Sequence, residues 1–254
     1  METFNIVLWG MGILGLVVFV ALYFVDAGYG KMISKKWGPT LPNRLGWMLM
    51  ECPVFFVMLA LWWTSPVART VPYWVFLLLF EVHYFHRSFV FPLRLKGRSR
   101  MPVAIVAMSF AFNLVNGYIQ GWWLFRLAPQ TLYYDSYWLQ TPQFLGGTVL
   151  FIAGMIINRQ SDNIISHLRA PGDTRHYLPH GGLYNYVTSA NYFGEIVEWM
   201  GWALLTWSWA GFIFFWFTCA NLVPRAASIY RKYEQEFPDE FDKTRLKRVF
   251  PFIY

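Results

Sequence analysis

Apolar residues gather in six stretches of the chain, near residues 5–25, 45–64, 73–92, 102–124, 143–158 and 192–223. A helix of about 20 mostly apolar residues crosses the ~30 Å hydrocarbon layer of a membrane. The last stretch would measure about 48 Å as one helix, which exceeds an ordinary crossing, so we expect it to divide at Trp207–Trp209. The pattern therefore predicts an all-α polytopic membrane protein with seven transmembrane helices.

The positions of lysine and arginine orient these helices. With seven crossings, all but Arg69 and Arg126 of the 21 Lys and Arg lie on one side of the membrane. Because basic loops stay in the cytoplasm, we expect the N-terminus outside and the C-terminus in the cytoplasm. A six-helix arrangement would place the basic C-terminal tail across the membrane from the other basic loops, so seven helices fit the charges better.

Composition excludes an ordinary soluble domain, because 56% of the residues are hydrophobic and only 14% are charged. A net charge of +7 would suggest nucleic acid in a soluble protein. Here the cations orient the helices and contact membrane lipid, so we expect no nucleic-acid partner. No polar linker divides residues 1–254, which predicts one membrane domain. It would lie in the endoplasmic reticulum of a eukaryote or the inner membrane of a bacterium; the sequence does not define an oligomeric state.

Titratable side chains interrupt the third apolar stretch, in the segment Glu81-Val-His-Tyr-Phe-His-Arg87. Charged groups at membrane depth usually face a bundle interior or a wet cavity and serve a function. Glu51 in the second stretch is a similar case, since apolar surroundings favour its neutral, hydrogen-bond-donating form. Tyr84 and Arg87 are three residues apart, so both can line one face of a helix. These residues predict a site rather than a plain membrane anchor.

A second group of polar residues surrounds Asn191-Tyr-Phe-Gly-Glu195. Before it we expect a polar connecting loop that starts at Asn158–Asp162. Arginine and asparagine there suit phosphate and ribose, since a guanidinium binds phosphate through paired donors. The basic, aromatic tail 225–254 is expected to be a surface helix on lipid headgroups or a lid over a cofactor cavity.

Two other motifs do not indicate a functional site. Gly10-Met-Gly-Ile-Leu-Gly15 matches a dinucleotide fingerprint, but it lies inside a predicted membrane helix without the strand that this mechanism needs. We expect these glycines, like Gly117 and Gly121, to let helices approach closely. His83 and His86 lack a further convergent cluster of ligands, so we predict no metal site.

The chain resembles the steroid 5-alpha-reductases, membrane-embedded enone reductases that use NADPH. The resemblance rests on the order and spacing of several motifs. They are Gly28-Tyr-Gly-Lys31, Glu51, His83-Tyr-Phe-His-Arg87, Gly97-Arg98, Asn158, Ser161-Asp162, Leu168-Arg169, Pro171-Gly172, Gly181-Gly-Leu183, Asn191-Tyr-Phe-Gly-Glu195, Glu198-Trp199 and Phe250-Pro-Phe-Ile-Tyr254. The family is seven-helical with a cytoplasmic C-terminus, which agrees with the topology expected from charge.

The resemblance implies roles for individual residues. Glu51 and Tyr84 would hold the substrate carbonyl. The nicotinamide dinucleotide would be held by Tyr29, Arg87, Arg98, Asn116, Asn158, Asp162, Arg169, Asn191, Glu195, Arg225 and Tyr233. The chain departs from the family where His176-Tyr-Leu-Pro179 stands in place of a frequent Tyr-Arg-Ile-Pro, and where Met50 replaces a common Gln. These departures leave the contacts to the 2'-phosphate and the natural substrate open.

The hypothesis from sequence is NADPH-dependent reduction of the carbon–carbon double bond of a 3-oxo-4-ene steroid, with hydride passing to C5. Three alternatives stay open. The first is a reductase of another lipid enone, such as an enoyl thioester or a polyprenoid. The second is a prenylcysteine-type methyltransferase, whose basic C-terminal region looks similar. The third is a transporter or lipid-binding protein, although the sequence lacks the inverted repeats typical of many transporters.

Overall fold

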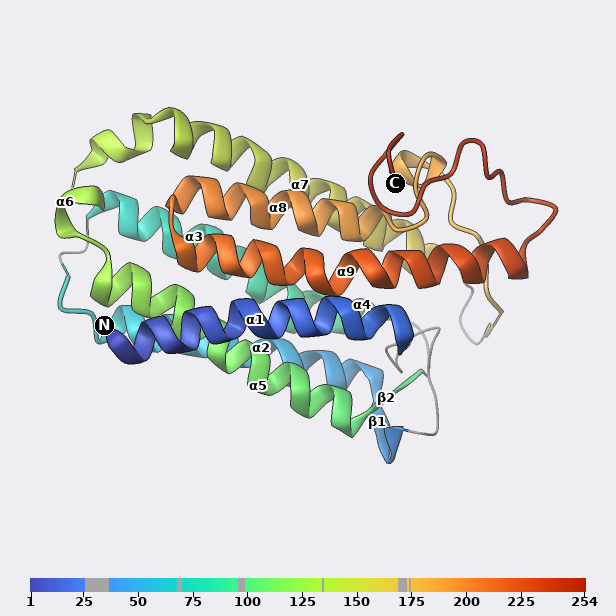
Figure 1. Ribbon diagram of the computed structural model, residues 1–254, viewed down its shortest axis with the longest axis horizontal. Helices are drawn as coiled ribbons and strands as arrows, with labels where there is room; N and C mark the ends of the chain where they lie inside the picture. The colour runs from blue at the N-terminus through green and yellow to red at the C-terminus, as the bar shows by residue number, and fades with distance from the viewer. Residues whose placement is uncertain (26–36, 68–69, 96–98, 134, 169–172, 174) are drawn as a thin grey trace. The chain divides into compact units, whose positions relative to one another are not determined.

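The computed structural model describes residues 1–25, 37–67, 70–95, 99–133, 135–168, 173 and 175–254. Helices dominate this part of the chain (Figure 1). They are α1 (Glu2–Phe24), α2 (Asn43–Trp63), α3 (Val71–Phe85), α4 (Phe91–Arg94), α5 (Val103–Trp122), α6 (Gln130–Tyr133), α7 (Pro142–His167), α8 (Ala190–Thr206) and α9 (Trp209–Glu236). The prediction of a helical membrane fold is confirmed, except that two short strands, β1 (Thr40–Pro42) and β2 (Arg100–Pro102), form an antiparallel pair.

Four helical segments among the described residues are long and apolar enough to cross a membrane: Glu2–Phe24, Asn43–Trp63, Val103–Leu127 and Trp209–Glu236. The other three predicted crossings give shorter or more polar helices. The α-helical part of α3 has 15 residues and α8 has 17, while the second half of α7 is polar. The structure therefore supports an integral membrane protein, and the count of seven crossings stays a prediction.

The long apolar stretch 192–223 divides where the sequence predicts. Helix α8 ends at Thr206 and α9 begins at Trp209. Between them Trp207 has a φ of 44°, in the left-handed region that residues other than glycine rarely adopt. A helix cannot continue through that conformation, so the chain turns.

The described chain falls into two compact units. Unit 1 comprises Met1–Gly10, Gly28–Leu145 and Thr206–Ala210, and unit 2 comprises Met11–Ala27, Gly146–Leu205 and Gly211–Tyr254. We describe each unit by itself. The expectation of a single domain over 1–254 stays a prediction.

In unit 1, α2 and α5 pack closely because glycines remove side chains from their contact. A Cβ on Gly117 would lie 3.0 Å from Val57 Cβ, and one on Gly121 would lie 2.8 Å from Leu61 Cδ1. The predicted role of these two glycines in close helix approach is confirmed. Strands β1 and β2 run directly into α2 and α5, and Leu41 pairs with Met101, so the strand pair joins the starts of the two helices.

In unit 2, helices α7 and α8 are in backbone contact, and they run side by side in Figure 1. Gly147 and Gly154 on α7 face Gly201 and Gly194 on α8. A Cβ on Gly154 would lie 2.2 Å from the Glu198 nitrogen, and one on Gly194 would lie 2.4 Å from the Asn158 nitrogen. Only glycine fits at such distances, so these four residues set how close the helices lie. Two pairs of glycines seven residues apart keep to one helical face.

The glycine motif 10–15 is helical, as expected, and lies within α1. A Cβ on Gly12 would lie 3.0 Å from Ile213 Cδ1, and one on Gly15 would lie 2.8 Å from Trp216 Nε1. The Trp216 indole also donates a hydrogen bond to the Gly12 carbonyl at 3.1 Å. Gly12 and Gly15 therefore give α9 access to the α1 backbone, whereas nothing lies within 4 Å of a Cβ on Gly10.

One predicted loop is helical, and the basic tail begins as part of a long helix. Asn158–Asp162 was expected in a polar connection, but α7 continues through it to His167. The first part of the basic tail, which was expected to be a surface helix or a lid, belongs to α9, which ends at Glu236. Beyond it the tail is tied to the segment before α8, since Thr188 N donates to Lys247 O at 2.9 Å and Lys247 N donates to Tyr186 O at 2.8 Å.

Candidate active site

Three amide side chains form a buried polar stripe on α5: Asn113, Asn116 and Gln120. Their spacing of three and four residues keeps them on one helical face. Asn113 Nδ2 donates to the Met50 carbonyl at 2.6 Å and to Glu51 Oε2 at 3.3 Å. The first predicted catalytic residue is therefore in contact with α5 within unit 1.

The second predicted catalytic residue, Tyr84, meets the next amide of the stripe. Asn116 Nδ2 donates to the Tyr84 hydroxyl oxygen at 3.3 Å. Gln120 Nε2 in turn donates to Asn116 Oδ1 at 3.4 Å and to the Ala210 carbonyl at 2.8 Å. All three side chains are buried. An amide that donates to a phenol oxygen directs the phenol proton toward another acceptor, so the arrangement presets Tyr84 as a donor.

Glu51 and Tyr84 lie on different helices, yet both contact α5, through Asn113 and Asn116. These two amides are one helical turn apart. The structure thus brings the predicted catalytic pair to neighbouring turns of one helix. Asn116, which was predicted to contact the cofactor, donates to the Tyr84 hydroxyl, and its contact with a cofactor stays a prediction.

Arg87 follows α3 in a π-helical turn, His86–Val90. Its guanidinium carbon lies 4.8 Å from the Trp47 ring centroid and 4.9 Å from that of Phe91. Proline at position 92 has no N–H for the carbonyl of Ser88, which accounts for the irregular turn. Such π-turns are frequent at functional sites. A cation between two aromatic rings suits Arg87 to a fixed anionic or aromatic ligand group.

In unit 2, a chain of hydrogen bonds joins four polar residues beyond the glycine contact. Asn158 Nδ2 donates to the Asn191 carbonyl at 2.9 Å. The Asn191 side chain donates to Asp162 Oδ1 at 3.2 Å and accepts from the Tyr184 hydroxyl at 3.3 Å. Burial raises the pKa of Tyr184 well above its ordinary value, and the charge of Asp162 adds to this. Tyr184 therefore stays protonated as a donor, and both ends of the Asn191 amide are held.

Three more predicted cofactor residues lie in unit 2. The Arg225 guanidinium is 5.5 Å from the ring centroid of Tyr192. Tyr233 is buried in an apolar cluster with Leu178 and Phe241. Glu195 lies on α8, four residues after Asn191 and so on the same face of the helix.

Three predicted residues, Tyr29, Arg98 and Arg169, lie outside the described part of the chain. Among the residues that are described, no group of three His, Cys, Asp or Glu side chains is placed to hold a metal ion.

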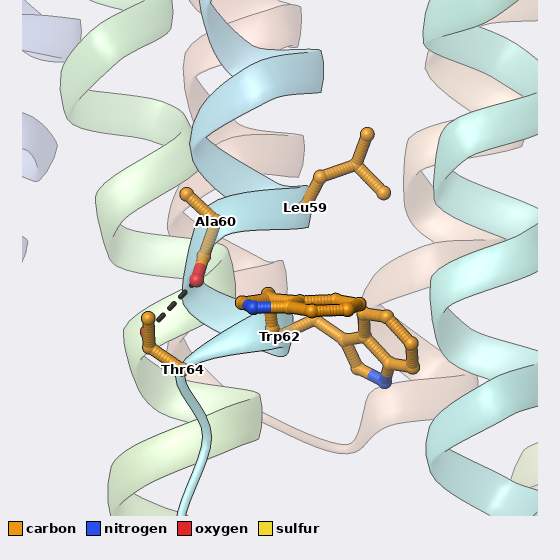
Figure 2. A pocket seen from close by; sticks show the side chains of 5 residues that line it. Leu59, Ala60, Trp62 and Thr64 are labelled. Atoms are coloured by element: carbon orange, nitrogen blue, oxygen red, sulfur yellow. Dashed lines mark hydrogen bonds between the residues drawn. The ribbon is translucent and has the colours of Figure 1, made fainter.

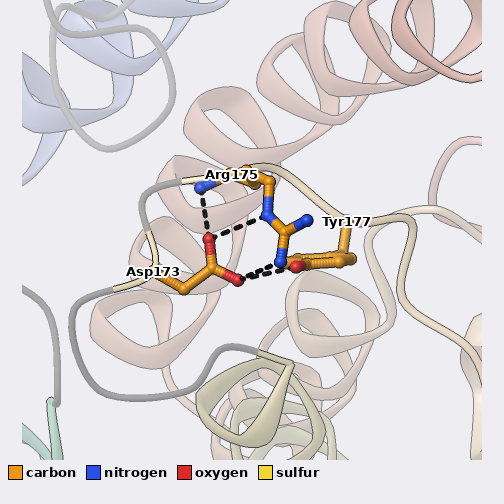
Figure 3. A network of polar contacts seen from close by, with 3 residues as sticks. All are labelled: Asp173, Arg175 and Tyr177. Carbon is orange, nitrogen blue, oxygen red and sulfur yellow. Dashed lines mark hydrogen bonds and ion pairs between the residues drawn. The ribbon is translucent and has the colours of Figure 1, made fainter.

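The segment before Gly181 contains a compact polar network (Figure 3). Asp173 accepts from the Arg175 backbone at 2.9 Å, from Arg175 Nε and Nη2 at 3.2 and 3.0 Å, and from the Tyr177 hydroxyl at 2.6 Å. These bonds, led by the Arg175 side chain, hold the pKa of Asp173 well below its ordinary value. The aspartate is thus already paired with the arginine at this part of the surface.

A hollow of about 400 Å³ lies at the C-terminal end of α2, lined by Leu59, Ala60, Trp62, Trp63 and Thr64 (Figure 2). Thr64 Oγ1 donates to the Ala60 carbonyl at 2.8 Å. About 20 Å of helix separates Thr64 from Glu51. The lining is apolar and contains no predicted site residue, so this hollow is not the site implied by sequence.

The sequence interpretation missed Asn113, Gln120 and Tyr184. A signal for the first two was present, because amides at positions 113, 116 and 120 repeat with helical spacing inside an apolar segment. Tyr184 had no comparable signal, since its contact with Asn191 depends on how the segment before α8 folds.

The chemical groups of the site indicate the class of protein. In a helical membrane protein, a half-buried carboxyl and a buried phenol contact the amides of one helix. A second group of residues contains hydrogen-bonded amides and a carboxylate, and a guanidinium lies against Tyr192. Such groups suit the binding of a polarised carbonyl and of a nucleotide.

Comparison with known proteins gives the family. Residues 99–254 match the model of the 3-oxo-5-alpha-steroid 4-dehydrogenase family. The chain is 41% identical to steroid 5-alpha-reductase DET2 of Arabidopsis thaliana over 92% of its length and 90% of the relative. It is 38% identical to DET2 of Gossypium hirsutum, over 99% and 97% of the two chains. It is 37% identical to 3-oxo-5-alpha-steroid 4-dehydrogenase 1 of Homo sapiens, over 94% and 91%. The chain belongs to the steroid 5-alpha-reductase family of oxidoreductases.

Proposed function

We propose that the protein reduces the carbon–carbon double bond of a 3-oxo-4-ene steroid with NADPH. The observation that carries the proposal is the pair of contacts from neighbouring turns of α5, Asn113 to Glu51 and Asn116 to Tyr84. They hold a half-buried carboxyl and a buried phenol, and hydrogen-bond donors that are shielded from water act more strongly on developing charge.

In the proposed reaction, negative charge builds on the ketone oxygen as an enolate forms. Tyr84 donates to that oxygen, and Glu51 supports the same oxygen from α2. One such donor typically lowers the barrier by ~2.7–4 kcal/mol. Asn116 keeps the phenol proton directed away from α5, and Gln120 holds the Asn116 amide in that orientation. Bound NADPH supplies the hydride that the β-carbon, C5, receives.

The groups of unit 2 fit a pyridine nucleotide by their chemistry. The Asn158 and Asn191 amides suit the carboxamide, the Asp162 carboxylate suits ribose hydroxyls, and the Arg225 guanidinium suits phosphate. Ser189 adds a buried hydroxyl with no partner among the described residues. We assign Glu195 and Tyr233 to the same role. Tyr29, Arg87, Arg98, Asn116 and Arg169 complete the assignment from the family resemblance.

We further propose seven membrane crossings, with the N-terminus outside and the C-terminus in the cytoplasm. This topology puts the basic connections on the side where NADPH is available, while an apolar substrate enters from the lipid. The membrane is the endoplasmic reticulum in a eukaryote and the inner membrane in a bacterium.

The test is NADPH consumption by purified protein with a panel of enones, followed by the mass of each product. The panel contains 3-oxo-4-ene steroids, a polyprenoid enone and an enoyl thioester. We expect turnover with a steroid and a product heavier by two hydrogens. Turnover with the polyprenoid or the thioester alone would indicate that the substrate is another lipid enone and not a steroid. Binding of S-adenosylmethionine without NADPH consumption would favour a methyltransferase, and an inert protein would favour a transporter or lipid-binding role.

A further inference from the structure

Glu81 is a buried carboxyl that the proposed reaction leaves without a role. It lies on α3 and is 9% exposed. Neither of its carboxyl oxygens has a hydrogen-bond partner among the residues that the structure describes. An ionised carboxylate in such a place is strongly disfavoured, so the group holds its proton.

The position of Glu81 ties it to the candidate active site. Glu81 precedes Tyr84 by three residues, so the two side chains lie on neighbouring turns of the same helical face, with Cβ atoms ~5–6 Å apart. Ser88 follows Tyr84 by four residues on that face. Its hydroxyl is fully buried and also has no partner in the described chain. Tyr84 is thus flanked on both sides by polar groups with unmet hydrogen bonds.

Stability does not explain this arrangement. The same face of α3 carries Tyr73, Phe76, Leu77 and Phe80, all buried, and a leucine at 81 would continue that apolar surface. A buried polar group with no partner weakens a fold and calls for a specific explanation. A ligand that completes the hydrogen bonds is such an explanation.

The proposed reaction needs a group of this kind. After hydride reaches the β-carbon, the enolate must gain a proton at its α-carbon, and neither Glu51 nor Tyr84 is assigned to that step. The α-carbon is bonded to the carbonyl carbon, so it lies two bonds from the oxygen that Tyr84 holds. A donor one helical turn from Tyr84 is within reach of it.

We propose that Glu81 is the proton donor to the α-carbon of the substrate enone. This inference rests on the proposed function. In the step, the carboxyl O–H bond of Glu81 breaks, a C–H bond forms at the α-carbon, and the enolate electrons return as the ketone. The hydride comes from the nicotinamide cofactor, so the double bond gains one hydride and one proton. Glu81 is left as a carboxylate and takes a proton from water before the next turnover.

The experiment compares wild-type protein with Glu81→Gln, which keeps the size of the side chain but cannot release a proton. General acid catalysis contributes roughly 10²–10⁴-fold, so kcat should fall by that factor while KM and NADPH affinity stay unchanged. The matched control is Tyr73→Phe. Tyr73 is a second buried hydroxyl without a described partner on the same face of α3, two turns from Glu81, and its removal should leave kcat unchanged.

Chemical rescue separates proton donation from a structural role. Glu81→Ala leaves space for a small carboxylic acid, so added acetate should raise its kcat with concentration. Glu81→Leu fills that space, so it should stay inactive with acetate while its thermal midpoint equals or exceeds that of the wild type. Full activity of Glu81→Gln, or no acetate effect on Glu81→Ala, would overturn the inference. A wild type that consumes no NADPH with any enone would overturn both proposals, whereas an active wild type with an equally active Glu81→Gln would overturn this one alone.

Discussion

The two units place their polar groups by different means. In unit 1, the Glu51 and Tyr84 side chains are held by hydrogen bonds from other side chains, the amides of α5. In unit 2, Asn158 and Asn191 are held first by backbone contact, because glycines let α7 and α8 touch at Gly154 and Gly194. Removing one side chain from a hydrogen-bond network loses only the bonds that this side chain makes. Adding a side chain at a backbone contact produces a steric clash that separates the two helices. The units should therefore respond differently to substitution.

The largest expected effect is in unit 1, on Tyr84→Phe. Loss of the phenol donor should lower kcat by about 10²–10³-fold and leave NADPH affinity within the range of the wild type. Steady-state kinetics and titration of NADPH binding measure the two quantities. Wild-type turnover in this variant would remove Tyr84 from the reaction.

The next effect falls on the backbone contact of unit 2. Gly154→Ala puts a methyl group against the Glu198 nitrogen, so it should destabilise the protein by about 3 kcal/mol, the upper part of the range for overpacking. Gly146→Ala is the matched control on the same helix, since nothing lies within 4 Å of its Cβ position. It should be neutral or slightly stabilising, because alanine favours a helix. Thermal unfolding in detergent compares them, and equal midpoints would refute the account of the α7–α8 contact.

A smaller effect is expected for Asn191→Leu, which removes the side-chain contacts to Asp162 and Tyr184. With about 1 kcal/mol for each hydrogen bond, NADPH affinity should fall by roughly 10–30-fold. Turnover at saturating NADPH should change little. If the substitution lowers kcat at saturation and spares NADPH binding, the assignment of the nucleotide to this cluster is wrong.

Asn116→Leu should have a milder effect in unit 1. The donor to the Tyr84 oxygen is lost, so kcat should fall by about fivefold to tenfold, in line with ~1 kcal/mol for one hydrogen bond. In a Tyr84→Phe background the same change should have almost no further effect, because its partner is already gone. Additive losses in the double variant would show that Asn116 acts independently of Tyr84.

The smallest effect concerns Asp173. The pKa of Asp173 is lowered, mainly by the Arg175 side chain. The stability that ionised Asp173 gives to the folded segment is therefore fully present above the ordinary aspartate pKa of about 3.9. It is lost only as pH falls through the lowered pKa. Resistance of segment 175–181 to limited proteolysis should thus stay constant from about pH 8 to pH 5. Asp173→Asn should be cleaved faster across that range, and a wild type that becomes sensitive near pH 6 would contradict the network.

The sequence predicted individual helices better than their contacts. The need for a division in the stretch 192–223 followed from its length and from the distribution of lysine and arginine. The extension of α7 through Asn158–Asp162 was missed because polar residues were interpreted as a loop, whereas their partners on α8 favour the helix. Tertiary context overrides local propensity in such segments.

Pairing between distant helices explains the other omissions. Gly147 and Gly154 allow backbone contact because Gly201 and Gly194 lie opposite them on α8. The local sequence does not show which residues of two distant helices lie opposite each other. The resemblance to a family pointed to Glu51 and Tyr84. The spacing of the α5 amides was visible in the sequence, but their contacts with Glu51 and Tyr84 became evident only from the packing of α5. Asn116 shows the limit most clearly, since its contact with Tyr84 was not predicted from the sequence.

The most direct test of the account is transfer of label to a 3-oxo-4-ene steroid from NADPH in which both hydrogens at nicotinamide C4 are replaced by deuterium. We predict that the wild-type product carries one deuterium at the β-carbon, C5, and a solvent-derived hydrogen at the α-carbon. A product without deuterium at the β-carbon would contradict the central claim. So would NADPH that stays unoxidised when the protein is incubated with the steroid.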